Sequence, residues 1–239
     1  MELPNTSPEP INEAAYANFM AEYTVICNGT FNSIPQYHEQ IKNLSLNPLC
    51  FPYVAKALLT EKSEAIVFLS SSIIINHIKK FGSHFTPNIL QDLGLNLLNT
   101  CCFDCGRQKL VKDSINKLIA VLLKYTWLET VNPLRESIEL LLNNTLTEAL
   151  LEFLIVLIDE MQSNETKVST IYRRVYYSFE SKWLCTIARF CIFLIASISE
   201  KKVDVSFVRI LLITFQSCLK YNEEEENTSD FYVTLSTKE

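Results

Sequence analysis

Hydrophobic residues recur at every third or fourth position along most of the chain. In 107–127 this spacing, on a period of 3.6 residues, places the apolar side chains on one side of a helix. The polar residues that fall largely on the other side are Lys112, Asp113, Asn116, Lys117 and Lys124. The stretch 63–81 has the same pattern, and between the two a helix over 87–100 begins with Thr86 as N-cap and Pro87 at its first position. Three amphipathic helices with short links predict stacked helical hairpins.

The same periodicity extends over the rest of the chain and predicts about ten helices. Asn132-Pro133 repeats the N-cap signal, Thr145–Glu148 has the spacing of a capping box, and Glu180-Ser181 predicts a break between two helices. The predicted helices span 11–27, 35–44, 48–59, 63–81, 87–100, 107–127, 133–143, 147–161, 170–179, 182–199 and 205–219.

Glycine and proline are too scarce for a strand-rich fold. The chain has four glycines, and no proline follows Pro133. Helices that alternate in antiparallel pairs, at roughly 35 to 45 residues per pair, are typical of helical-hairpin arrays. We therefore predict an all-α fold, an α-α superhelix (HEAT-repeat solenoid) of about five antiparallel helix pairs. A single globular bundle is the alternative, but it needs long crossovers that the short links do not provide.

The expected organisation has three parts. Residues 1–10, with three prolines, form a flexible lead-in, and 11–221 form the solenoid. Residues 222–239 form an acidic polar tail or the start of a long insertion, in which Phe231–Leu235 is either a strand or a packed stub. Terminal repeats need polar outer faces, so we expect the apolar flank of 182–219 to self-associate unless Phe231–Leu235 folds over it.

Charge and hydropathy exclude two kinds of partner. A net charge of −6 and a pI near 5.2 leave no basic stripe for a nucleic acid. The most apolar stretch, 183–199, is short for a membrane span and contains Arg189, so no membrane insertion is expected. The N-terminus lacks the basic and apolar regions of a signal peptide, which predicts an intracellular protein.

Candidate catalytic chemistry is sparse. The eight cysteines lie mostly in apolar runs and are expected to be reduced and structural. Cys102 and Cys105 form a lone CxxC without the two further ligands that zinc needs. No nucleophile, phosphate-binding or zinc-protease motif is present, so we expect neither an enzyme nor a cofactor. Trp127 and Trp183 are interpreted as packing anchors.

Two stretches resemble a known family. Glu64–Trp127, with the small pair Ser70-Ser71 midway along its first helix, resembles the N-terminal HEAT repeats of importin-β-like karyopherins. Tyr172-Arg-Arg-Val-Tyr-Tyr-Ser-Phe-Glu-Ser-Lys-Trp-Leu184 is similar to a segment of the broad-spectrum exportin branch, the exportin seven and exportin four group, although Tyr172 replaces its histidine. Ser217-Cys-Leu219, followed by the acidic run Glu223–Glu226, also looks like that branch.

This resemblance implies the N-terminal portion of a nuclear transport receptor that shuttles between cytoplasm and nucleus. The family's N-terminal repeats bind Ran-GTP on their concave face, and its outer helices bind FG-repeat nucleoporins. Protein cargo is held mostly by later repeats. A different class of hypothesis is a generic HEAT or armadillo scaffold for protein–protein interaction without Ran dependence, and a third is a helical-bundle adaptor.

In such an array the second helix of each pair lines the concave side. The polar positions of those helices are therefore the candidate Ran contacts: Ser72, Asn76, Lys79, Asp113, Asn116 and Lys117. The alternative interpretation is that they are the solvated faces of amphipathic helices. Likewise Arg173-Arg174 is either a solvated turn or a contact for an acidic partner or for Glu223–Glu226.

Overall fold

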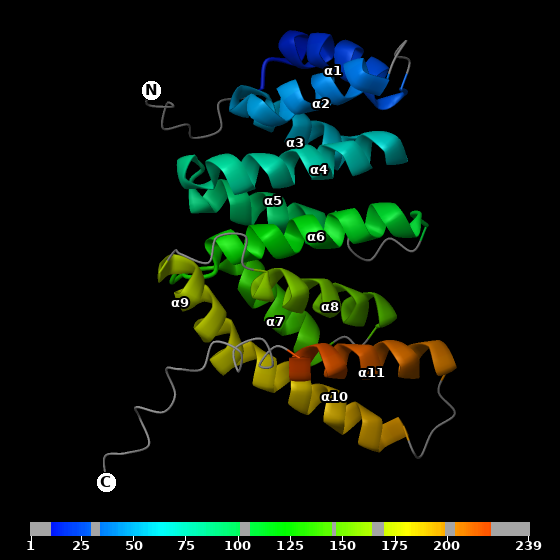
Figure 1. Cartoon of the computed structure of the whole chain (residues 1–239), viewed down its shortest axis with the longest axis vertical. Coiled ribbons are helices and arrows are strands. Elements are labelled where there is room, and N and C mark those ends of the chain that lie inside the picture. The colour runs from blue at the N-terminus through cyan, green and yellow to red at the C-terminus, as the bar shows by residue number, and fades with distance from the viewer. Residues whose placement is uncertain are drawn as a thin grey trace. The chain divides into compact units, whose positions relative to one another are not determined.

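The computed structural model describes residues 11–29, 34–100, 106–144, 147–163, 170–198 and 204–220 (Figure 1). Every regular element within these ranges is helical, which confirms the predicted all-α fold of contacting helix pairs. The α-helices of the described part are α1 (Glu13–Cys27), α2 (Ile34–Leu46), α3 (Phe51–Thr60), α4 (Glu64–Phe81), α5 (Pro87–Thr100), α6 (Lys109–Thr126), α7 (Pro133–Asn144), α8 (Glu148–Gln162), α9 (Thr170–Phe179), α10 (Cys185–Ile198) and α11 (Val205–Lys220).

The chain divides into two compact units, Met1–Leu140 and Leu141–Glu239, which are described one at a time. In the first unit α3 packs on α4 and α5 packs on α6, and two pairs of helices two places apart are also in contact, α3 with α5 and α4 with α6. Contacts to both the next helix and the one after it are what a stack of helical hairpins requires.

α4 and α6 lie side by side and run in the same direction (Figure 1). At their N-terminal ends the Glu64 carboxylate accepts a hydrogen bond from the backbone N–H of Gln108, 2.8 Å away. At their C-terminal ends a Cβ added to Gly82 would lie 2.5 Å from Cε1 of Tyr125, so the Tyr125 ring packs directly on the backbone that follows α4. α4 and α6 are thus parallel neighbours, with the antiparallel α5 between them in the sequence. This is the repeat geometry that the sequence predicted.

The small pair in the middle of α4 lies in the core. Ser70 and Ser71 are fully buried, and the Ser70 hydroxyl is 2.8 Å from the hydroxyl of Tyr23 on α1. Ser71 donates to the Val67 carbonyl of its own helix at 2.8 Å. A buried hydroxyl pair satisfies two polar groups that would each be costly to leave unpaired, and it ties α1 to α4.

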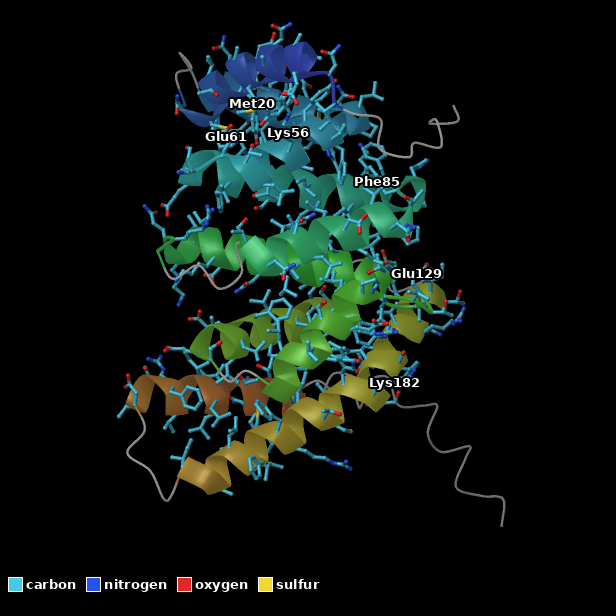
Figure 2. All side chains as sticks on the ribbon, turned by 180° about the vertical axis from the view of Figure 1, so that it is seen from behind. Met20, Lys56, Glu61, Phe85, Glu129 and Lys182 are labelled. Atoms are coloured by element: carbon cyan, nitrogen blue, oxygen red, sulfur yellow. The ribbon has the colours of Figure 1, made fainter. Side chains whose placement is uncertain are left out.

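α1 is also joined to α3 by a charged contact at the surface. Lys56 of α3 donates to the Glu13 carboxylate at 2.7 Å, and its ammonium lies 4.2 Å from the ring centre of Tyr16 (Figure 2). The Glu13 side chain is 80% exposed, so this ion pair contributes only about 0–1 kcal/mol.

In the second unit α11 packs on both α8 and α10. The side-chain amide of Gln162 at the end of α8 donates to the backbone carbonyl of Lys220 at the end of α11, 3.2 Å away, so these two helices end together. The predicted break at Glu180-Ser181 is a π-helical turn, Glu180–Leu184, through which α9 continues into α10 without leaving the helix. Lys182 in this turn is exposed (Figure 2).

Of the predicted caps, Asn132 on α7 is confirmed, but the capping box at α8 is wrong, because Thr147 is the N-cap and Glu148 is the first helical residue instead of the third. Asn132 accepts from the backbone N–H of Arg135 at 3.0 Å and caps α7. α8 is capped by Thr147, which accepts from the backbone N–H of Leu150 at 3.2 Å. Four predictions fall outside the described residues, as does Thr145 itself: the lead-in 1–10, the CxxC at 102–105, the acidic run 223–226 and the apolar segment 231–235.

Candidate protein-binding surface

Three of the six predicted contact residues share one stripe of α4. Ser72, Asn76 and Lys79 follow one another at spacings of four and three; Asn76 is exposed and the other two are half-buried. Phe68, 36% exposed, begins the same stripe, and its carbonyl accepts the Ser72 hydroxyl at 3.1 Å. α4 therefore presents a mixed stripe, apolar at one end and basic at the other.

The remaining three lie on α6, and one of them is corrected by the structure. Asp113 and Lys117 are half-buried, but Asn116 is only 3% exposed, and Lys124, which the pattern also placed on the polar side, is 6% exposed. α6 contacts both α4 and α5, so its buried arc is wider than the single stripe that an amphipathic pattern implies. Asn116 is not part of a surface that a partner can reach in this structure.

The register of α4 and α6 decides which of the remaining residues come together. Glu64 lies level with Gln108 and Gly82 lies level with Tyr125, which places Ser72 level with Ile115 and Asn116. Farther along, Asn76 and Lys79 lie level with the part of α6 in which Ala120 and Leu123 are fully buried. The structure therefore places Lys117 one to two residues past the level of Ser72, whereas Asn76 and Lys79 have no exposed polar residue of α6 at their own level.

The two tryptophans anchor packing, as predicted. Trp127 is 1% exposed; its carbonyl accepts from the Arg135 guanidinium at 3.1 Å, and that cation lies 5.9 Å from the indole centre. Trp183 is 5% exposed and its ring centre is 6.3 Å from that of Phe179. Neither ring is available to stack on a ligand.

One histidine and one cysteine approach each other in the first unit. The Nε2 atom of His77 is 2.8 Å from the Leu44 carbonyl and 3.9 Å from Sγ of Cys50. The carbonyl accepts only if Nε2 is protonated, which leaves no base facing the thiol. The Cys50 thiol itself donates to the Asn47 carbonyl at 2.9 Å, and burial raises its pKa to about 11. These residues hold the turn after α2 against α4 and do not form a nucleophile–base pair.

The other buried thiols are equally unreactive in character. Burial raises the pKa of Cys191 to about 11 and that of Cys218 to about 12. All cysteines within the described ranges are free, as the sequence predicted. No group of three or more acidic, cysteine or histidine residues in the described part of the chain could hold a metal ion. Likewise, none of the described helices is both long and apolar enough to span a bilayer.

The sequence pattern missed an exposed apolar stripe on α11. Leu212 is 50% exposed, and Val205 and Ile213 on the same side of the helix are 80% and 38% exposed. The side that faces the unit's interior instead carries Leu211, Thr214 and Cys218. Because α11 is apolar nearly all round, its hydrophobic residues do not show which side of the helix faces the interior of the unit. Arg209 and Gln216 are polar, seven residues apart and therefore on one side of the helix, and they were the signal in the sequence that this side faces outward.

No model of a known protein family, no curated protein and no solved structure matches this chain. The arrangement of the described helices is therefore the evidence on which a functional proposal rests, together with the collinear motifs in the sequence.

Proposed function

We propose that the chain is a helical-repeat protein that binds other proteins, and that it forms the N-terminal part of an exportin-like nuclear transport receptor that binds Ran-GTP. The observation that carries the first part is the parallel pairing of α4 and α6, from Glu64 and Gln108 to Gly82 and Tyr125. Such pairing presents adjacent helix faces as one ridged surface, the kind of surface by which helical arrays bind proteins. Support for the second part comes from the motifs in 64–127 and 172–184.

In this proposal the Ran contacts are Ser72, Asn76 and Lys79 on α4 and Asp113 and Lys117 on α6. The set carries two lysines and one aspartate, which suits a partner surface of mixed charge. A GTPase orders its switch segments only when the γ-phosphate is bound, so a surface that fits the ordered segments binds the two nucleotide states with different affinity. FG-repeat nucleoporins, cargo and shuttling between nucleus and cytoplasm belong to the same proposal.

The burial of Asn116 and Lys124 favours a second candidate, a scaffold that binds proteins without Ran. Their loss from the surface interrupts the polar side of α6 and separates Ser72 and Lys117 from Asn76 and Lys79. Smaller separate patches fit short segments of several partners as well as they fit one folded GTPase.

Binding of the purified chain to Ran loaded with a non-hydrolysable GTP analogue or with GDP separates the two candidates. The receptor proposal expects at least tenfold tighter binding of the GTP form, which corresponds to about 1.4 kcal/mol. Lys79→Glu and Lys117→Glu should each weaken that binding about tenfold, whereas Lys62→Glu, an exposed control between α3 and α4, should not. Equal binding to both states, or none to either, would favour the scaffold.

A further inference from the structure

The outer side of α11 is an apolar strip with one cation in its middle. Val205, Val208, Arg209, Leu212, Ile213 and Gln216 follow one another along a single side of the helix and line a shallow, open depression of ≈ 500 Å³. Val205 is 80%, Leu212 50% and Leu219 56% exposed. A contiguous apolar strip rimmed by polar residues on a folded surface marks a docking site.

The charged side chains of α10 and α11 themselves are all basic, although the acidic residue Asp204 lies directly before α11. α10 and α11 together contain Arg189, Arg209 and Lys220 and no acidic residue. Residues 221–239, which follow α11 directly, contain six acidic residues, four of them in Glu223–Glu226, and one lysine. Opposite charge next to an apolar strip favours a segment that combines an acidic run with apolar side chains.

The chain itself has such a segment at a suitable distance. Phe231-Tyr-Val-Thr-Leu235 follows the acidic run, and Phe231 lies eleven residues after Lys220. Eleven extended residues span about 36 Å. The sixteen residues of α11 are about 24 Å long. The segment can therefore reach any point on the strip by turning back, and its tether gives it a local concentration that a separate molecule rarely matches.

We propose that Phe231–Leu235 docks in cis on the Val205–Gln216 side of α11, with Glu223–Glu226 directed to Arg209 and Lys220. The docked segment shields the strip from self-association and competes with any other protein that would bind there. This inference does not depend on Ran binding, because it concerns only the second unit.

Chymotrypsin cleavage after Phe231 and Tyr232, followed by intact mass, tests docking in the full chain. A synthetic peptide of residues 221–239 gives the rate of the unprotected bonds. We expect cleavage in the full chain to be at least tenfold slower, and the protection to be the same at 1 and 50 μM protein. Leu212→Asp and Arg209→Glu should each reduce the protection at least fivefold, and 1 M NaCl should reduce it for the unaltered chain.

Leu110→Asp is the matched control, because Leu110 is also an exposed leucine, 62% accessible, on a helix of the other unit. Arg209 is exposed, so Arg209→Glu keeps the test valid if Leu212→Asp unfolds the unit, which circular dichroism reports. Cleavage as fast as in the peptide, or protection that neither α11 variant changes, would overturn the proposal. Protection that grows with protein concentration would also overturn it and would assign the strip to a second copy of the chain.

Discussion

Replacing Tyr23 by phenylalanine removes a hydroxyl that lies between α1 and α4 and is 2.8 Å from the hydroxyl of Ser70. Tyr23 is 1% exposed and Ser70 is 0% exposed, so water cannot take the place of the lost group. A buried polar group that loses its partner costs about 1–3 kcal/mol, whereas replacing both partners by apolar groups costs little. We expect Tyr23→Phe and Ser70→Ala each to destabilise the first unit by about 1–2 kcal/mol.

The Tyr23 hydroxyl also interacts with the Cys27 thiol, a weak hydrogen-bonding group, so the double variant should cost less than the sum of the two single losses, with a coupling of about 1 kcal/mol. Urea unfolding followed by tryptophan fluorescence measures this in a Trp183→Phe background, where Trp127, buried in the first unit, is the one remaining indole. Tyr16→Phe is the control, since its hydroxyl contact to Thr60, 3.3 Å long, is exposed and should be worth less than about 0.5 kcal/mol. Additive losses from the two single variants would show that this hydroxyl pair does not link α1 to α4.

Two further predictions concern the first unit. Burial lowers the pKa of His77 below its ordinary value of 6.5, so the fold favours the neutral ring; its contribution is complete above pH 6.5 and is lost as pH falls from there toward the lower folded pKa. Stability should fall with a slope of about 0.7 kcal/mol per pH unit at pH 6.5 that steepens toward about 1.4 below it, and His77→Asn, measured by urea unfolding between pH 7 and 5.5, should remove that slope. A Cβ at Gly94 would lie 2.5 Å from Cδ2 of the buried Leu134, so Gly94→Ala should destabilise by about 1 kcal/mol, because overpacking exceeds the gain in helix propensity. In a Leu134→Ala background the same change should become stabilising, and a loss in both backgrounds would contradict the packing argument.

Helix positions were predictable from local chemistry. Pro87 begins α5 and Asn132 caps α7 as the sequence indicated, because proline at the first position and a side-chain cap act through the backbone of their own helix. These features depend on neighbours along the chain, whereas the burial of Ser70 depends on α1, whose Tyr23 hydroxyl lies 2.8 Å from the Ser70 hydroxyl.

The faces of the inner helices were less predictable. A period of 3.6 residues identifies one buried stripe, and it correctly left Ser72 and Asn76 accessible on α4. It could not indicate that α6 packs against two helices, which buries Asn116 and Lys124, or that α11 turns Leu212 outward. Those outcomes depend on how many neighbours a helix has, and that number is a property of the tertiary arrangement.

The π-helical turn Glu180–Leu184 gives the long helix of the second unit an unusual tolerance to mutation. A π-turn holds one residue more than a regular turn, so the helix on either side keeps its facing although the chain is one residue longer. Removing one exposed residue there, such as Ser181, should convert the turn to regular helix and leave Ile187 and Cys191 facing the interior. The same deletion within α4 would rotate every following side chain by about 100°. This turn can therefore absorb the loss of one residue without repacking of the unit.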